Sequence, residues 1–424
     1  MKIFLDTIGC RLNQSEIETY ARQFRAAGHY LVADHAEADL AVINTCMVTA
    51  AAAADSRKKI RGVARAGAAE VVVTGCWSTL NPQEAASLPG VGQVIPNSGK
   101  DSLVPAILGI PPGDLDLESV AREPIPGARL RTRAFIKVQD GCDNRCTFCV
   151  TTLARGSGRS QPEQDVLADV RAALRGGRQE IVLTGVHLGS WGQDFASPRH
   201  LRHLVEVILR ETNVPRLRLS SLEPWDIEAD FFSLWEDERL ARHLHLPLQS
   251  GCAATLRRMA RKTTPEAFAQ VVEAARAAIP NVAITTDVMT GFPGESESEF
   301  AESLAFVRQM GFAHGHVFTY SARPGTAAAQ MPNQVPHPVR RARNTQMRAA
   351  FDEAAIAYRT RFLGQRLSVL WESATDLGTE GWAVSGLTGN YLRVSAIAHE
   401  RAWNRIALVE LTGLTERGLA GRIG

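Results

Sequence analysis

Three cysteines near the middle of the chain have a spacing that suits iron–sulfur chemistry. Cys142, Cys146 and Cys149 form a C-x₃-C-x₂-C run. Three thiolates can hold three irons of a four-iron cluster, and the missing fourth ligand leaves one iron open to bind another molecule. A zinc site usually has four protein ligands, and no fourth cysteine or nearby histidine accompanies this run. The run therefore predicts a four-iron cluster with one open iron.

Three further cysteines each end an apolar run in the first part of the chain. The runs KIFLDTIGC, LAVINTC and VVVTGC end at Cys10, Cys46 and Cys76. Free cysteines pack well in cores, so each alone could be a structural thiol. Their shared position at the ends of predicted strands favours one common site, because open α/β sheets bind ligands at that edge. Cys252, in QSGC, lacks this setting and is predicted to be a packed thiol.

The elements that position Cys10, Cys46 and Cys76 form a predicted domain over residues 1–110. Helices are predicted between the strands, at Ser15 to Ala27 and Ala50 to Ala66. Strands that alternate with helices indicate βαβ units, whose right-handed crossovers point the strands the same way. We expect an open parallel α/β sheet. Residues 111–133 are rich in proline, glycine and charge and are predicted to be a linker.

Residues 134–362 contain six apolar runs that alternate with helical segments. The runs are AFIKVQ, EIVLTG, RLRLSS, HLHLPLQ, VAITTDVMTG and HVFTYS, and the helices include Pro265 to Ile279 and Ser296 to Met310. Six βα units predict a partial barrel that is open on one side. In such a barrel, the open iron can bind the amino and carboxylate groups of S-adenosylmethionine, whose reductive cleavage gives a 5′-deoxyadenosyl radical.

The last segment, residues 363–424, has a different pattern. Short apolar alternations (LSVLWES, GWAVSG, YLRVSAIA, IALVELTG) are broken by glycine. This pattern predicts a small antiparallel β domain, which is a barrel if it closes. The whole chain is thus predicted to be an α/β protein of three domains.

Polar and glycine residues follow several predicted barrel strands. Ligands bind at the carboxyl ends of barrel strands, and glycines there let the backbone approach a cofactor closely. Ordinary turn chemistry is the alternative explanation for each residue. The residues predicted to bind S-adenosylmethionine are Thr184, Gly185, Ser220, Ser221, Glu223, Gln249, Gly291, Gly294 and Glu295.

The charge distribution confines any nucleic-acid surface to a small part of the chain. The formal net charge is only +2, but residues 340–366 hold seven arginines against two acidic residues, a local balance of +5. We predict that Arg340, Arg341 and Arg343 contact phosphates, although a solvated helix face is the common alternative. Residues available for base stacking, or for core packing instead, are Trp371, Trp382, Tyr391 and Trp403.

Length and cysteine usage limit the class of protein. A chain of 424 residues exceeds one compact core, which supports two or three domains. Seven cysteines without an export signal favour reduced thiols over disulfides. Asp6 interrupts any signal peptide, and no uncharged apolar run approaches the roughly 18 residues that span a bilayer. We expect a cytoplasmic protein with no membrane partner.

The cysteine patterns together resemble the radical S-adenosylmethionine methylthiotransferase family. The C-x₃-C-x₂-C run is similar to its radical signature, and GLTGNYLRV with GLAGRI resembles its RNA-binding TRAM domain. The resemblance implies two 4Fe-4S clusters, with Cys10, Cys46 and Cys76 as ligands of an auxiliary one, and S-adenosylmethionine as both methyl donor and radical source. It also implies an electron donor such as flavodoxin or ferredoxin.

Three motifs resemble one substrate branch of that family. TGVHLGSWG, SSLEPWD and HLHLPLQSG are similar to the branch that methylthiolates N6-threonylcarbamoyladenosine at position 37, in the tRNA anticodon stem-loop. Isopentenyladenosine in tRNA and an aspartate of a ribosomal protein are the alternative substrates. A non-enzymatic iron–sulfur RNA-binding protein is the rival from another class, but a structural cluster gains nothing from an open iron.

Overall fold

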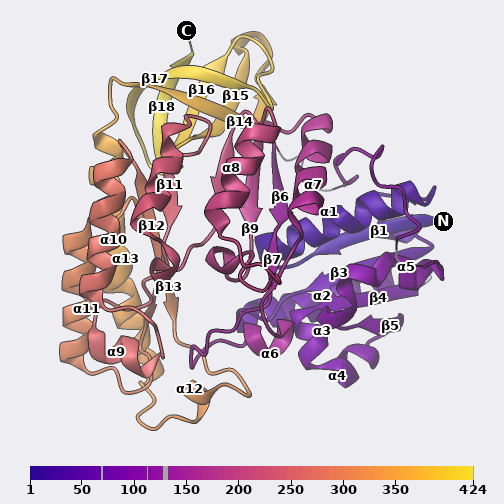
Figure 1. Ribbon diagram of the computed structural model, residues 1–424, viewed down its shortest axis with the longest axis horizontal. Helices are drawn as coiled ribbons and strands as arrows, with labels where there is room; N and C mark the ends of the chain where they lie inside the picture. Colours follow the sequence, from indigo (N-terminus) through magenta and orange to yellow (C-terminus); the bar gives the residue numbers. More distant parts are fainter. Residues whose placement is uncertain (68–69, 112, 128–131, 424) are drawn as a thin grey trace.

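The computed structural model describes residues 1–67, 70–111, 113–127 and 132–423, and its chain forms three β-structured parts (Figure 1). The α/β fold class is confirmed. The predicted linker 111–133 lies partly outside the described residues, at 112 and 128–131. The proposed domain bounds stay predictions. In the described part of the chain, no helix has the length and apolarity needed to span a bilayer.

The first part is a parallel sheet of five strands in the order β2-β1-β3-β4-β5. The strands are β1 (Lys2–Thr7), β2 (Tyr30–Leu31), β3 (Leu40–Thr45), β4 (Glu70–Gly75) and β5 (Val91–Ile95). Both predicted helices are present, as α1 (Arg11–Ala26) and α2 (Ala50–Arg65). In β3, Val42 packs into one core cluster and Ile43 into another. Two buried faces explain the continuous apolar run that precedes Cys46.

The second part is an open parallel barrel of six strands. The strands are β6 (Arg133–Lys137), β9 (Glu180–Thr184), β10 (Leu217–Leu219), β11 (His243–His245), β12 (Ala283–Thr290) and β13 (His314–Thr319). Isolated bridges join the halves β6-β9-β10 and β11-β12-β13, one of them between Ser221 and His245. Among the described strands, β6 and β13 do not pair, so the predicted opening lies between them.

Helices cover the outside of this barrel (Figure 1). They include α7 (Glu163–Arg175), α8 (Leu201–Glu211), α10 (Pro265–Ala278), α11 (Glu297–Met310) and α13 (His337–Thr360). Outward-facing side chains such as Ile136, Leu183 and Leu244 pack in the main core with residues of these helices. The alternate residues of each strand therefore face the lumen of the barrel.

The third part is a closed five-stranded β-barrel in the order β14-β15-β16-β18-β17. The strands are β14 (Arg366–Asp376), β15 (Trp382–Thr388), β16 (Arg393–Ala398), β17 (Ile406–Thr415) and β18 (Gly418–Ile423). The predicted small β domain is confirmed as a closed barrel, whose one pairing that is not antiparallel among the described strands joins β16 and β18. Trp371 is completely buried in its core, so this residue cannot stack on a base.

The β-barrel closes the amino end of the open barrel. Arg218 donates to the carbonyls of Thr388 and Gly389 at 3.2 and 3.0 Å, and its guanidinium lies 4.9 Å from the ring centroid of Tyr391. Tyr391 has a left-handed φ of 65° and stacks on His243 with the centroids 4.6 Å apart. Tyr391 is therefore a contact between domains and not a free stacking platform.

The first part packs against the open barrel through α1, which lies on β6. The Ser15 hydroxyl accepts the backbone N–H of Lys137 at 2.9 Å. The short helices α3 (Cys76–Leu80) and α6 (Thr151–Arg155) also pack on each other. Since α3 begins at Cys76 and α6 begins just after Cys149, the two cysteine trios lie on either side of this contact.

Candidate functional site

The turns after β1 and β4 require glycine. A Cβ atom on Gly9, which has a φ of 108°, would lie 2.4 Å from the sulfur of Cys46. A Cβ atom on Gly75, which has a φ of 103°, would lie 2.3 Å from the carbonyl oxygen of Thr45. No other residue type permits both the backbone conformation and this close approach. The glycines before Cys10 and Cys76 therefore let both turns close around Cys46.

Amide side chains contact two of these thiols. The Cys10 thiol lies 3.6 Å from Oδ1 of Asn13, and Nδ2 of Asn97 lies 3.7 Å from the sulfur of Cys76. Cys46 and Cys76 are buried, whereas Cys10 keeps contact with solvent. Burial raises the pKa of Cys46 to about 11, and the negative forms of Cys10 and Cys76 add to that shift. The three thiols are thus close enough to affect one another.

The donor set at this sheet edge suits a cluster better than a single ion. Within the described ranges, no three His, Cys, Asp or Glu side chains converge on one metal position. A four-iron cluster has a different requirement, because each thiolate binds a different iron. Buried polar atoms of Asn44, Thr74 and Asn97 also have no hydrogen-bond partner among the described residues. The edge therefore offers unused hydrogen-bonding capacity to a polar group.

Backbone and side-chain donors surround the second trio. The backbone N–H groups of Asn144 and Thr151 donate to the sulfurs of Cys142 and Cys149, each at 3.4 Å. Nη1 of Arg261 lies 3.9 Å from the sulfur of Cys146. Burial raises the pKa of the Cys146 thiol, and the Arg261 charge opposes that shift. Donors aimed at sulfur favour the thiolate form that binds iron.

A histidine–aspartate pair adjoins the second trio and was not among the predicted site residues. Nε2 of His187 lies 2.5 Å from Oδ2 of Asp226, and Nδ1 lies 3.5 Å from Nδ2 of Asn144. Burial lowers the pKa of His187, but Asp226 and Cys142 outweigh it and raise that pKa to about 10. Both residues stand in quoted motifs, TGVHLGSWG and SSLEPWD, so the signal was present in the sequence.

Glu223 lies in the site as the partner of an arginine. Its carboxylate accepts from Arg261 at 2.6 Å, and the Arg261 guanidinium lies 4.6 Å from the ring centroid of Trp225. Arg261 also contacts Cys146, so Glu223 orients a group beside the second trio. No sequence pattern indicated Arg261.

The other predicted cofactor residues lie at the carboxyl ends of neighbouring strands. Thr184 ends β9, Gly185 follows it, and Ser220 and Ser221 follow β10. Gln249, with a left-handed φ of 71°, bridges to Val288 of β12. Buried hydroxyls without a partner in the described chain surround this end of the barrel, and these are Ser220 Oγ, Thr290 Oγ1 and Tyr320 Oη. They offer unused hydrogen-bonding capacity to a polar ligand such as S-adenosylmethionine.

The loop from Gly291 to Glu295 is held by arginines of α13. Oε1 of Glu295 accepts from the Gly291 backbone N–H at 2.9 Å and from Arg343 at 2.8 Å. A Cβ atom on Gly291 would lie 2.1 Å from Cγ of Arg340, so that side chain covers the glycine. Gly294, with a φ of 76°, completes the turn. The Glu295 carboxylate thus serves to brace the loop.

The three arginines that were predicted to contact phosphates differ in their exposure. Arg343 is only 5% exposed and pairs with Glu295 and Glu297, so its charge is not offered to a phosphate. Arg340 is half-buried and donates to the carbonyl of Tyr320 at 2.5 Å. Arg341 is exposed. Sequence alone could not separate these three arginines, because they share one helix but not one face.

Two family models match the chain. Residues 136–307 match the Radical SAM superfamily, and residues 2–95 match uncharacterized protein family UPF0004. The radical SAM structure of the methyltransferase TsrM from Kitasatospora setae, solved with cobalamin and a 4Fe-4S cluster, superposes with a TM-score of 0.60 at 14% identity and covers 77% of each chain. That likeness shows the fold.

Curated relatives match nearly the whole chain. The threonylcarbamoyladenosine tRNA methylthiotransferases MtaB of Bacillus subtilis and Thermotoga maritima are each 34% identical to it, over 96% and 98% of this chain and 92% and 95% of their own lengths. A tRNA-2-methylthio-N(6)-dimethylallyladenosine synthase of Sphingopyxis alaskensis is 33% identical over 85% of this chain and 86% of its own. This chain therefore belongs to the radical S-adenosylmethionine methylthiotransferase family.

Proposed function

We propose that this enzyme converts N6-threonylcarbamoyladenosine at position 37 of tRNA to its 2-methylthio derivative. Cys142, Cys146 and Cys149 would hold one 4Fe-4S cluster, and Cys10, Cys46 and Cys76 an auxiliary one. When bound and reduced, the first supplies the electron that cleaves S-adenosylmethionine, and a second S-adenosylmethionine supplies the methyl group. Flavodoxin or ferredoxin is the proposed electron donor.

Sequence similarity alone does not choose the substrate, because relatives of two tRNA branches have almost equal identities of 34% and 33%. The polarity of the lumen of the open barrel supports threonylcarbamoyladenosine as the substrate. A threonylcarbamoyl group brings a carboxylate and a hydroxyl, which need hydrogen-bonding partners, whereas a dimethylallyl group needs an apolar pocket.

The lumen wall beside the barrel opening is polar. Nε2 of His245 lies 3.3 Å from Oδ2 of Asp287, and His316 follows on β13 with a ring centroid 6.4 Å from that of His245. Asp287 pairs with His316 in the strand register, so these three side chains point into the same space. Such a wall suits a polar substituent better than a hydrocarbon.

Arg11 adds a permanent positive charge to this space. It directly follows Cys10, and its Nη2 donates to the Tyr391 hydroxyl at 3.2 Å. In the described chain Arg11 has no carboxylate partner, and its charge adds to the lowering of the His316 pKa that burial mainly causes. We propose that Arg11 receives the substrate carboxylate, and that Asp287 accepts from its hydroxyl.

The remaining residues would orient the cofactor and the RNA. His187 and Asp226 hold the loop of Cys142, and Arg261 holds Cys146 against the end of β10. The predicted cofactor residues at the ends of β9, β10 and β11 would bind polar groups of S-adenosylmethionine. For the anticodon stem-loop, Arg341 is the exposed member of the predicted set and stays our candidate phosphate contact.

Nucleoside analysis of cellular tRNA tests the proposal. Deleting the gene should remove 2-methylthio-N6-threonylcarbamoyladenosine, leave its precursor without the methylthio group, and spare the isopentenyl derivative. If the isopentenyl product disappears instead, the family chemistry stands but the substrate assignment is wrong.

A further inference from the structure

The carboxyl end of α6 touches both sides of the contact between the two cysteine sites. Arg155, its last residue, is about 2% exposed at the side chain. The guanidinium donates to Asn13 Oδ1 at 2.7 Å, to Glu16 Oε1 at 3.0 Å and to Asp140 Oδ1 at 2.8 Å. Asn13 and Glu16 belong to α1, whereas Asp140 ends the short strand before the Cys142 loop. One side chain therefore links the two domains.

Two hydrogen-bonded paths lead from this helix end to the first trio. Asn13 Oδ1, which accepts from Arg155, is also the atom 3.6 Å from the Cys10 sulfur. Asn97 Nδ2 donates to the carbonyl of Ala154 at 2.6 Å and lies 3.7 Å from the Cys76 sulfur. Consecutive residues of α6 thus hold the amides that contact two of the three thiols.

The charges around Arg155 are not equally buried. Lys100 pairs with Glu16 at 2.5 Å and is 1% exposed, and Lys137 lies 3.5 Å from Asp140. Three cations, with Arg155 among them, thus face two buried carboxylates, and a third carboxylate, Asp101, pairs with Lys137 from the exposed side. Buried ion pairs seldom add stability, because desolvation offsets their attraction, so stability alone does not explain this cluster of charges.

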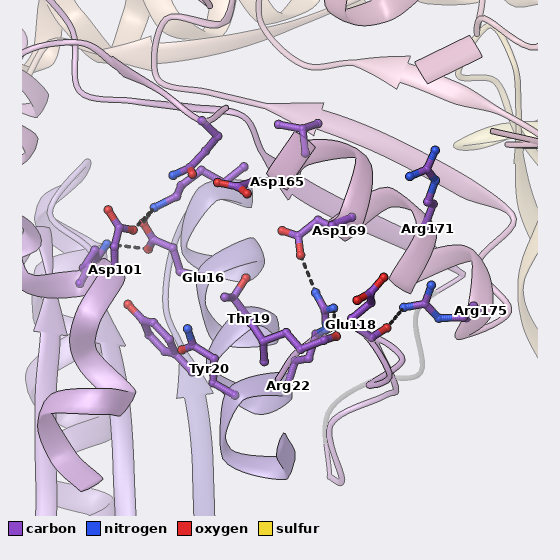
Figure 2. A pocket seen from close by; sticks show the side chains of 17 residues that line it. Glu16, Thr19, Tyr20, Arg22, Asp101, Glu118, Asp165, Asp169, Arg171 and Arg175 are labelled. Carbon is purple, nitrogen blue, oxygen red and sulfur yellow. Dashed lines mark hydrogen bonds and ion pairs between the residues drawn. The ribbon is translucent and has the colours of Figure 1, made fainter. Parts of the chain in front are cut away.

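On the side away from the cysteines, Glu16, Lys100 and Lys137 line a pocket of about 590 Å³ between α1 and α7 (Figure 2). Asp101 reaches Lys137 from the rim at 2.9 Å and is 60% exposed, so water weakens its charge. Among the buried groups the cations therefore outnumber the carboxylates, and Arg155 is the cation linked to a thiol, through Asn13.

We propose that Arg155 is a positioning residue that couples the two cysteine sites and sets the electrostatic potential at Cys10, Cys46 and Cys76. The inference rests on the proposed function, in which this trio holds the auxiliary cluster. Nearby charge and hydrogen bonds set the potential of an iron–sulfur cluster. A fixed positive charge favours the more reduced, more negative state, so Arg155 raises the midpoint potential there.

The test uses the full-length chain with Cys142, Cys146 and Cys149 changed to Ala, so that iron bound after anaerobic reconstitution reports the first trio alone. Redox titration followed by electron paramagnetic resonance gives the midpoint potential. In this background Arg155→Gln should lower the potential, and Arg155→Lys should keep it close to the starting value because the charge remains.

Two further variants keep the test decisive. Arg155→Gln combined with Asp140→Asn removes the buried pair together, and it should still lower the potential if the single variant does not fold, because Arg155, and not Asp140, donates to the amide beside Cys10. Arg22→Gln is the matched control, since Arg22 pairs across the same domain contact with Asp169 at 2.7 Å without acting on a cysteine. It should leave the potential unchanged.

A failure of the auxiliary cluster and a failure of the proposed role of Arg155 would give different results. A background protein that binds no iron would overturn the auxiliary cluster, and the inference with it. A background protein that binds about four irons, with one potential shared by the parent, Arg155→Gln and the double variant, would overturn only the role of Arg155. A shift of equal size in Arg22→Gln would do the same, because loosened domain packing would then explain it.

Discussion

At the residue scale, the two cysteine trios differ in their surroundings. In the first trio Cys46 and Cys76 are buried, Cys10 is exposed, and neutral amides contact Cys10 and Cys76, whereas Cys142, Cys146 and Cys149 are all half-exposed. Backbone N–H groups and Arg261 point at sulfurs of the second trio. A half-exposed loop with aimed donors suits exchange of a small molecule at an open iron. The buried thiols of Cys46 and Cys76 suit a group that stays bound.

This difference predicts that the half-reactions separate. Cys146→Ala should abolish cleavage of S-adenosylmethionine, because its iron site is lost. Cys46→Ala should retain cleavage to 5′-deoxyadenosine and form no methylthiolated RNA. Reconstituted protein should hold about eight irons, and each trio changed to Ala should leave about four. Cys252→Ala, a buried cysteine outside both sites, is the control and should keep both activities. Equal behaviour of the first two variants in the cleavage assay would contradict this division.

At the element scale, the amino ends of β9 and β10 are held to the β-barrel by a buried charge. Glu180 is completely buried and accepts from Arg218 at 2.7 Å and from Arg216 at 3.4 Å. Burial would raise the pKa of Glu180, but the arginines prevail and hold it at about 2. The charged form is therefore stabilised in the folded protein.

The sign of the pH effect follows from this depressed pKa. The pair contributes stability at pH values above the unfolded carboxyl pKa of about 4.3, and the contribution is lost as pH falls from there toward 2. Glu180→Gln should destabilise the protein by about 3–5 kcal/mol at neutral pH, because it leaves buried arginines unpaired. Denaturant unfolding of both proteins between pH 7 and 3 measures this, and the variant should show a shallower acid loss. Parallel curves would show that another carboxylate dominates.

The helix α13 divides its arginines between bracing and exposure, which predicts which of them bind RNA. Arg341 and Arg348 are exposed, whereas Arg343 is bound to Glu295. Changing Arg341 and Arg348 to Gln should weaken tRNA binding and reduce its salt dependence by up to about one slope unit per lost contact. Arg210→Gln on α8, an arginine 65% exposed at the side chain, is the control. An unchanged salt slope would show that α13 is only a solvated face.

How far sequence predicts these elements depends on their length and burial. Strands β1, β3 and β4 were predicted because apolar runs mark them, while β2 has two residues and β5 carries exposed Gly92 and Gln93. The barrel strands and helices α10 and α11 agree with prediction within a residue or two, except that β11 ends four residues before the end of the predicted run HLHLPLQ. The Arg155–Glu16 pair could not be predicted, because 139 residues separate the partners. The periodicity of apolar residues shows which face of a helix or strand is buried. It does not show which distant element packs against that face.

At the scale of the whole molecule, Arg11 joins all three parts of the chain. It stands at the start of α1 beside Cys10, its guanidinium lies 5.9 Å from the ring centroid of Phe135 in β6, and it donates to Tyr391 of the β-barrel. The wall of His245, Asp287 and His316 faces the same lumen. The proposed pocket for the substrate carboxylate therefore exists only when the three parts are assembled.

This assembly gives the prediction that bears most directly on the substrate. Arg11→Gln should lower kcat/KM about 10–100-fold for an anticodon stem-loop carrying N6-threonylcarbamoyladenosine, since a hydrogen bond to a charged group contributes about 1.5–3 kcal/mol. The same RNA with its carboxylate as a methyl ester should be a poor substrate for the parent enzyme and should lose little more in the variant. Arg65→Gln, an exposed arginine of α2, is the control and should alter neither rate. Equal losses on both RNAs would mean that Arg11 acts through its contact with Tyr391, because only a direct contact with the carboxylate distinguishes the acid from its ester.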